Sequence, residues 1–240
     1  METANIKNSH DERIDCAFHQ GEKSDRLVII AHGVTGNKDR PMLITLAEEL
    51  SAKGWPCLRI SFSGNGGSEG EFTDSNITKE VADLLSVIDQ AGGGKKIAYI
   101  GHSMGGAVGA LAAARDERIN VLVSLAGMVR TAEFAKREFG DVTPGQGVMW
   151  EEEEFPLSQA YMDDLTQIDN TLEAAASFRL PWLLVHGTED DVVFPSDSHT
   201  LIDAIKGDKR LLEIEGAGHS FENHYSTLAE EINTWLKKHL

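Results

Sequence analysis

Short apolar runs alternate with longer segments of helical periodicity along most of the chain. The runs expected to form strands are 26–33, 56–62, 96–103, 119–127, 180–190 and 209–219. The segments expected to form helices are 41–54, 77–94, 105–116, 196–207 and 224–240. In 77–94, for example, Val81, Leu84 and Ile88 recur on one helical face and glycines follow. This alternation predicts an α/β fold, with a mostly parallel twisted sheet covered by helices on both faces.

Two segments depart from this alternation. Residues 13–20 have strand character but precede the first strong strand, and we expect them to add an antiparallel edge strand. Residues 128–178 contain only helix-like fragments and an acidic run. We interpret 128–178 as a short helical cap inserted above the carboxyl edge of the sheet, where open α/β sheets bind ligands. The predicted organisation is a single domain, 1–240, with this cap.

Charge and composition exclude several classes of partner. The chain carries 22 Lys+Arg against 39 Asp+Glu, a formal charge of −17, which repels nucleic acid and anionic membranes. It has no apolar run of about 18 residues and no visible secretory signal at its N-terminus. Its two cysteines, Cys16 and Cys57, do not form a disulfide framework. We expect a cytoplasmic protein, and the sequence leaves open whether it is a monomer or a homodimer.

The pentapeptide Gly-His-Ser-Met-Gly at 101–105 lies between a predicted strand and a small-residue helix. It fits the G-x-S-x-G nucleophile elbow, a turn too tight for side chains at Gly101 and Gly105. The turn exposes the hydroxyl of Ser103 at a helix N-terminus. The backbone N–H of Met104 then points to where an oxyanion would form. A serine so placed is the candidate nucleophile.

A serine hydroxyl needs a base, and the chain order for this elbow is Ser, Asp or Glu, then His. His219 ends the last predicted strand and is the candidate base, while His224, at the start of the last helix, is its main rival. The acid comes from the loop that contains Glu189, Asp190 and Asp191, and spacing does not choose among the three. Each candidate follows a strand's carboxyl end, where α/β active sites lie.

A second oxyanion donor is expected in the loop after the first strong strand, 26–33. His-Gly at the end of that strand lets the backbone N–H of Val34 turn toward the site. We interpret His32 as a residue that braces this loop, and His186 as a packed, hydrogen-bonded residue. His199 is expected to face solvent on a helix.

These residues together resemble the α/β-hydrolase superfamily, in particular small serine esterases of the feruloyl/cinnamoyl esterase-like group, of serine aminopeptidase S33 type. The resemblance covers nearly the whole chain. The segments that carry it are HGVTGNK, ISFSGNGGSEG, GHSMGG, HGTEDDVV and GAGHSF. It implies Ser103 as nucleophile, His219 as base, Asp190 as acid through the H-G-x-x-D pattern, and Val34 and Met104 as oxyanion-hole donors.

The chain departs from the family pattern at two positions. Ser61 stands where the family often has Asp, in a loop that supports the site, and Val34 replaces an aromatic residue. We expect the smaller Val34 to widen the acyl side of the pocket. Neither change removes a catalytic group.

The resemblance implies hydrolysis of small-molecule carboxylic esters of small to medium acyl or aromatic acids, through an acyl-enzyme and without a metal or organic cofactor. A thioesterase, an amidase or peptidase, and a C–C hydrolase would use the same triad. The alternative outside the enzymes is a non-catalytic ligand-binding module of the same fold.

Substrate specificity is expected to come mainly from the cap. Its apolar candidates for contact with substrate are Trp150, Phe155 and Tyr161, together with Met149 and Met162. The alternative is that these side chains form the cap's own small core. The acidic run at 151–154 fits a solvated face, and a second interpretation is that it disfavours anionic substrates.

Overall fold

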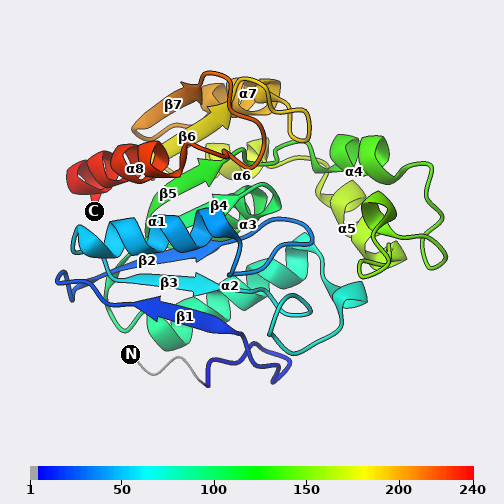
Figure 1. Cartoon of the computed structure of the whole chain (residues 1–240), viewed down its shortest axis with the longest axis horizontal. Helices are drawn as coiled ribbons and strands as arrows, with labels where there is room; N and C mark the ends of the chain where they lie inside the picture. The colour runs from blue at the N-terminus through cyan, green and yellow to red at the C-terminus, as the bar shows by residue number, and fades with distance from the viewer. Residues whose placement is uncertain (1–4) are drawn as a thin grey trace.

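A twisted sheet of seven strands forms the centre of the computed structural model, which describes residues 5–240 (Figure 1). The strands are β1 (Cys16–His19), β2 (Arg26–Ala31), β3 (Cys57–Ile60), β4 (Lys96–His102), β5 (Ile119–Leu125), β6 (Trp182–Gly187) and β7 (Lys209–Ile214). Their spatial order is β1-β3-β2-β4-β5-β6-β7. All neighbours pair in parallel except β1, which runs antiparallel to β3 at the edge. The expected mostly parallel sheet and antiparallel edge strand are confirmed.

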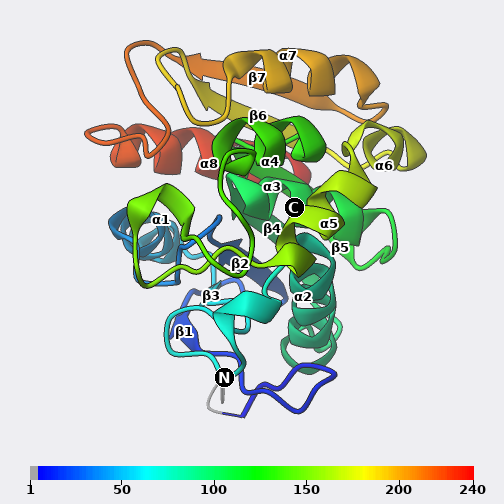
Figure 2. The same cartoon turned by 90° about the vertical axis from the view of Figure 1, so that its right-hand side faces the viewer.

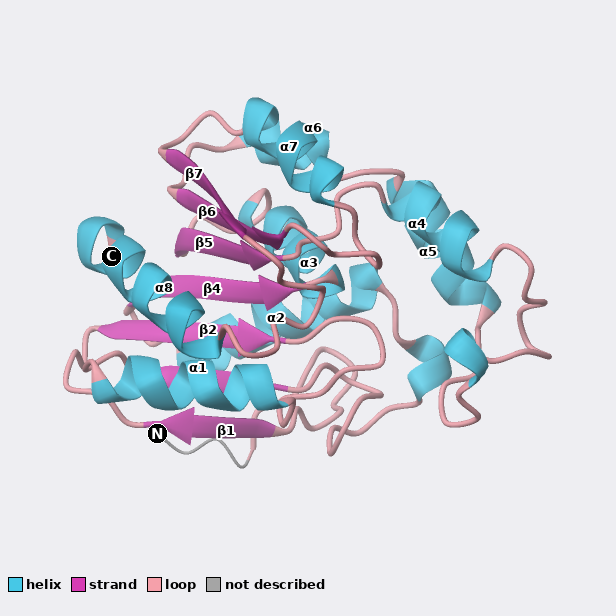
Figure 3. Ribbon diagram, turned by 45° about the horizontal axis from the view of Figure 1, so that its top comes forward, coloured by secondary structure: helices cyan, strands magenta, loops and turns pink. Residues whose placement is uncertain are grey.

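Helices cover both faces of the sheet, as the continuous apolar strands require. The α-helices are α1 (Pro41–Ala52), α2 (Ile77–Ala91), α3 (Met104–Ala113), α4 (Thr131–Phe139), α5 (Gln159–Ile168), α6 (Leu172–Ser177), α7 (Pro195–Ala204) and α8 (Tyr225–His239). Two 3₁₀ turns, η1 (Phe72–Asp74) and η2 (Met149–Glu151), lie in loops. α1 and α8 lie side by side in front of the sheet in Figure 3, and α2 and α3 lie behind it.

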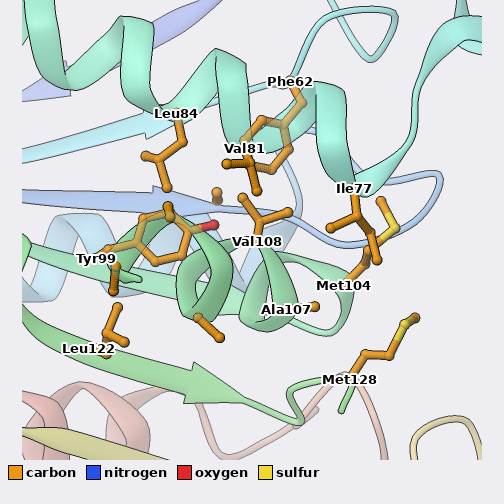
Figure 4. Packing of buried hydrophobic residues seen from close by; sticks show 14 of the residues in the cluster. Phe62, Ile77, Val81, Leu84, Tyr99, Met104, Ala107, Val108, Leu122 and Met128 are labelled. Atoms are coloured by element: carbon orange, nitrogen blue, oxygen red, sulfur yellow. The ribbon is translucent and has the colours of Figure 1, made fainter. Parts of the chain in front are cut away.

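Each face of the sheet has its own apolar core. On one face, residues of β4 pack against α2 and α3, and Figure 4 shows Tyr99 between these helices with Val81, Leu84 and Val108 nearby. On the other face, α1 and α8 cover Val28 and other residues of the central strands. The strands are buried on both sides, which is why they appear in the sequence as continuous apolar runs.

The segment between β5 and β6 supplies α4, η2, α5 and α6. Figures 1 and 3 show α4 and α5 beyond the arrowheads of the parallel strands, and Figure 2 turns this end toward the reader. The carboxylate of Asp197, in α7, accepts hydrogen bonds from the backbone N–H groups of Val129 (2.9 Å) and Arg130 (3.2 Å). It also forms an ion pair with the Arg130 guanidinium (2.6 Å). This carboxylate anchors the first residues of the cap to α7.

The carboxyl ends of β2, β4, β6 and β7 meet at one edge of the sheet. The loops that follow them contain the candidate residues Val34, Ser103, Asp190 and His219. None of the helices within residues 5–240 is long and apolar enough to cross a bilayer. Parallel pairing thus brings together residues that lie far apart in the sequence.

Candidate active site

Ser103 lies on the turn between β4 and α3 in a backbone conformation that few non-glycine residues adopt, with φ +54° and ψ −121°. The structure around the turn holds this strain. Its N–H donates to the Leu125 carbonyl (2.9 Å), and its carbonyl accepts from Gly106 (2.9 Å) and Met128 (3.0 Å). A strained residue fixed by its surroundings is a common feature of functional sites.

The two glycines of the elbow are required by close backbone approaches. A Cβ at Gly101 would lie 2.1 Å from the Gly105 carbonyl oxygen, and a Cβ at Gly105 would lie 2.5 Å from the His32 carbonyl oxygen. Both distances are below any real carbon–oxygen contact. Only hydrogen fits at either position, as the pentapeptide predicted.

The loop after β2 passes directly over the serine. A Cβ at Gly33 would lie 2.6 Å from the Ser103 Cβ, so the backbone of this loop touches the candidate nucleophile. Within residues 5–240, the N–H groups of Val34 and Met104 have no hydrogen-bond acceptor. The side chain of Met104 packs into the core (Figure 4), so its backbone is the part available to the site. Two unpartnered N–H groups beside a serine fit the donors of an oxyanion hole.

His32 braces the loop, as expected. Its Nδ1 lies 2.8 Å from the Gly33 carbonyl oxygen, and its Nε2 accepts a hydrogen bond from the Phe62 N–H (3.0 Å). These contacts specify the neutral ring with the proton on Nδ1. Burial lowers the pKa of His32 to about 4, so the ring stays neutral near pH 7. The buried Ser61 hydroxyl supports the same loop by accepting from the Lys38 N–H (3.0 Å).

The His219 imidazole is oriented by Asp190. Its Nδ1 lies 2.8 Å from the Asp190 Oδ2, and because a carboxylate only accepts, Nδ1 carries the proton. Nε2 is then the ring nitrogen able to take a proton from another group. Among the three adjacent acids, Glu189 and Asp191 are exposed, whereas Asp190 is buried. Tertiary contacts thus distinguish one carboxylate from its neighbours.

The Asp190 carboxylate remains ionised. Burial alone would raise its pKa. The His186 ring, whose Nε2 lies 3.2 Å from the Asp190 Oδ2, and the hydrogen bond and charge of His219 outweigh burial and hold the pKa of Asp190 well below its usual range. Its Oδ1 also accepts from the N–H groups of Val192 (2.9 Å) and Val193 (3.0 Å). An ionised carboxylate so placed stabilises an imidazolium on His219.

Three further histidines, His186, His199 and His224, have other environments. His186 is fully buried, with Nδ1 2.7 Å from the Ser198 hydroxyl and Nε2 2.8 Å from the Val193 carbonyl oxygen, the packed state that was expected. His199 is exposed beside Glu213. His224, the rival base, precedes the first turn of α8 and does not line the cavity described below.

His102 is a site residue that the sequence analysis did not single out. Its Nε2 donates to the His219 backbone carbonyl (3.0 Å), and the two imidazole rings lie 4.7 Å apart. Burial and then the charge of His219 lower the pKa of His102 to about 3. The variable position of G-x-S-x-G gives no signal of this role, because any residue type fits the pattern there.

A cavity of about 540 Å³ opens over these residues. Ser103, His102 and His219 line it together with the 32–36 loop. This volume lies within the range of small-molecule pockets, roughly 300–1,000 Å³. Within residues 5–240, no group of three or more His, Cys, Asp or Glu side chains is arranged to hold a metal ion.

The cap contributes less to this cavity than expected. Trp150 lines it, but Phe155 packs against Phe72 (ring centroids 5.1 Å apart) and Tyr161 is buried against Phe139 (6.0 Å). Neither Phe155 nor Tyr161 lines the cavity, and they contribute to the packing beneath the cap. Met149 is likewise buried and Met162 packs against the core. Of the three cap aromatics expected to contact substrate, Trp150 lines the cavity, whereas Phe155 and Tyr161 are used in packing.

Comparison with known families gives two matches. A family model described as alpha/beta hydrolase fold matches residues 26–159, more than half of the chain. A model described as serine aminopeptidase, S33, matches residues 154–224.

Two curated relatives match at low sequence identity. An uncharacterised protein of Mycobacterium tuberculosis is 29% identical over 209 residues, covering 84% of this chain and 66% of the relative. The mitochondrial palmitoyl-protein thioesterase ABHD10 of Homo sapiens is 26% identical over 179 residues, covering 69% of this chain and 57% of the relative. The chain thus spans two thirds or less of the length of these relatives.

Solved structures show the same fold at low identity. Est1E from Butyrivibrio proteoclasticus, with ferulic acid bound, superposes with a TM-score of 0.85 at 24% identity and covers 98% of each chain. ABHD10 from mouse superposes with a TM-score of 0.80 at 18% identity and covers 95% of each chain.

Proposed function

This chain belongs to the α/β-hydrolase fold family, and from that premise we propose that it is a serine hydrolase that cleaves carboxylic esters of small to medium acyl or aromatic acids. Ser103 is the nucleophile, His219 the base and Asp190 the acid. The N–H groups of Val34 and Met104 form the oxyanion hole. The substrate is a small molecule, and the cavity above Ser103 receives it.

One observation carries this proposal. Ser103 sits strained on a glycine-walled elbow and shares a cavity with His219, whose Nδ1 is bonded to a buried carboxylate. A packed structural serine would need neither the strain nor the oriented imidazole. The same set argues against a non-catalytic binding module, which has no use for an oriented base.

The geometry supports the following steps. His219 Nε2 takes the proton of the Ser103 hydroxyl while Oγ attacks the ester carbonyl carbon, and the carbonyl oxygen becomes an oxyanion bonded to the two N–H groups. The carbon–oxygen bond to the alcohol then breaks, and His219 returns the proton to the departing oxygen. Water, deprotonated by His219, attacks the acyl carbon. The bond from that carbon to Ser103 Oγ then breaks, His219 returns the proton to Oγ, and the acid is released.

A thioesterase is the second candidate. The observation that favours it is the similarity to ABHD10, a palmitoyl-protein thioesterase, both in sequence and in fold. Est1E with ferulic acid bound favours the ester of an aromatic acid instead. Thioester and oxygen ester would use the same steps and differ in the leaving atom.

The test is hydrolysis of a panel of p-nitrophenyl esters, aromatic-acid esters, acyl thioesters and amides, with covalent labelling by a fluorophosphonate. We expect hydrolysis of esters and labelling of Ser103, both abolished in Ser103→Ala, with kcat lower by about 10⁴-fold or more.

The control is Ser220→Ala, a second serine that lines the same cavity but lies outside the elbow. The Ser220→Ala variant should still be labelled by the fluorophosphonate. A folded wild-type chain that is neither labelled nor active on any substrate of the panel would overturn the proposal and favour the binding module. Faster turnover of thioesters than of matched esters would replace the ester by the thioester.

A further inference from the structure

Two helix starts contribute to the lining of the cavity. Pro41, Met42 and Leu43, in the first turn of α1, line it together with Tyr225, the first residue of α8. We call these four residues the α1–α8 wall. Within the described residues of the cap, Trp150 alone lines the same cavity. The two helix starts thus supply four residues to the lining of the cavity that contains Ser103, and the cap supplies one.

Three polar contacts join the two helices. The Trp55 indole N–H, just after α1, donates to Asn233 of α8 (3.0 Å), and Ser226 donates to Glu49 (2.6 Å). Lys53 pairs with Glu230 (2.6 Å). Figure 3 shows both helices running away from the carboxyl edge of the sheet. These contacts join α8 to the last turn of α1 and to the residues that follow it.

Two side chains of the wall are fixed by packing into the core. Met42 is 4% exposed and Leu43 is 1% exposed, because both also pack into the core beneath α1. A side chain fixed from behind presents the same surface before and after a ligand binds. Small-molecule pockets are usually preformed in this way.

Charge at the cavity favours an uncharged group. Arg40 and Glu222 both line the cavity and contribute opposite charges. The Arg40 guanidinium already donates to the Thr35 carbonyl (3.0 Å). The exposed acidic run that follows Trp150, 151–154, disfavours an anion near the cavity. Burial and then the charge of Glu222 raise the pKa of Tyr225, whose phenol stays neutral.

We propose that the α1–α8 wall, and not the cap, selects the substrate by packing against an uncharged apolar group of the ester, a hydrocarbon chain or a phenyl ring. The inference rests on the proposed function and adds to it the residues that choose among esters. Apolar contact is the source of discrimination, since each methylene in a hydrophobic pocket changes kcat/KM by roughly 10-fold or more.

The experiment compares Tyr225→Ala and Met42→Val with the wild type. The substrates are p-nitrophenyl acetate, butyrate and octanoate, which vary the acyl chain, and methyl, butyl and octyl acetate, which vary the alcohol. For each series we compare kcat/KM of the eight-carbon substrate with kcat/KM of the shortest substrate. We expect Tyr225→Ala to lower this ratio by about 10-fold in at least one series, mainly through KM. Met42→Val should change the same ratio by several-fold.

The matched control is Phe178→Ala, which truncates a half-buried aromatic residue at the end of the cap segment, stacked on Trp182 away from the cavity. It should keep the wild-type ratio. Thermal unfolding of each variant checks that it is folded.

The outcomes separate the two proposals. A wild type that hydrolyses esters, with ratios unchanged in both wall variants or equally changed in Phe178→Ala, overturns the wall as selector and leaves the esterase standing. A wild type that hydrolyses no ester and is not labelled overturns the esterase and, with it, the wall.

Discussion

At the scale of single residues, surroundings rather than residue type decide which groups can act. Glu189, Asp190 and Asp191 are adjacent acids, yet only Asp190 is buried, bonded to His219 and to two backbone N–H groups. A carboxylate that must stabilise an imidazolium needs this contact, because charge interactions weaken steeply in water.

The first prediction concerns this carboxylate. Asp190→Asn should lower kcat by about 10³–10⁴-fold, since an amide does not hold the imidazole of His219 with its proton on Nδ1. The exposed neighbour provides the matched control, and Asp191→Asn should stay within about twofold of wild type. Steady-state kinetics on p-nitrophenyl butyrate measure both. Equal losses in the two variants would show that Asp190 is not the acid.

At the scale of elements, one carboxylate joins the cap to the body of the protein. Asp197 lies in the first turn of α7 and accepts two backbone N–H groups from the start of the cap segment, as well as the Arg130 guanidinium. Because Asp197 is buried, removing its carboxylate would leave each of these donors without a partner and without full access to water. We therefore expect the Asp197 carboxylate to contribute to the stability of the fold where the cap segment begins.

The second prediction follows from this anchor. Asp197→Ala should lower the free energy of unfolding by about 2–3 kcal/mol, because it leaves buried N–H groups without acceptors. Asp203→Ala changes an exposed acid on the same helix and should cost less than about 0.5 kcal/mol. Urea unfolding followed by circular dichroism gives both values. A loss no larger than that of Asp203→Ala would contradict the anchoring role.

At the scale of the whole molecule, the formal charge is −17, and a few of the acidic side chains are buried. Glu80, in α2, is 1% exposed, and its Oε1 accepts from the Ser75 hydroxyl (3.2 Å). Burial and then the charge of Asp83 raise the pKa of Glu80 well above its usual value. The folded chain therefore keeps a proton that the unfolded chain releases above about pH 4.3.

The third prediction is a pH dependence of stability. Because the unfolded state binds fewer protons at this group, Glu80 lowers the free energy of unfolding progressively as pH rises from its unfolded pKa toward its folded pKa. Glu80→Gln removes this loss and keeps the acceptor for Ser75. Relative to wild type, the variant should gain about 1 kcal/mol or more between pH 5 and pH 8, since burying an ionised carboxylate costs several kcal/mol.

The control for Glu80→Gln is Glu117→Gln, which changes an exposed acid and removes the same formal charge. The difference between Glu117→Gln and wild type should stay constant over the same pH range. Urea unfolding at each pH measures these differences. A flat difference for Glu80→Gln as well would mean that Glu80 titrates alike in the folded and unfolded chains.

Sequence patterns alone predicted the order of strands and helices, the parallel sheet with its antiparallel edge, and the elbow at Ser103. These features depend on local periodicity and on close approaches that only glycine permits, and both are visible in short stretches of sequence. Chain order also pointed to His219 as the partner of Ser103, because parallel strands bring their carboxyl ends to one edge.

Three features depend on tertiary contacts: the bond of the buried Asp190 to His219, the bond of His102 to the backbone of His219, and the lining of the cavity by α1 and α8. His102 and His219 are 117 positions apart, and Pro41 and Tyr225 lie farther apart still. Contacts at such separations depend on how packed elements meet, and the pattern within each element does not encode them. The aromatic residues of the cap show the same limit, since the sequence left open whether they contact substrate or pack into a small core.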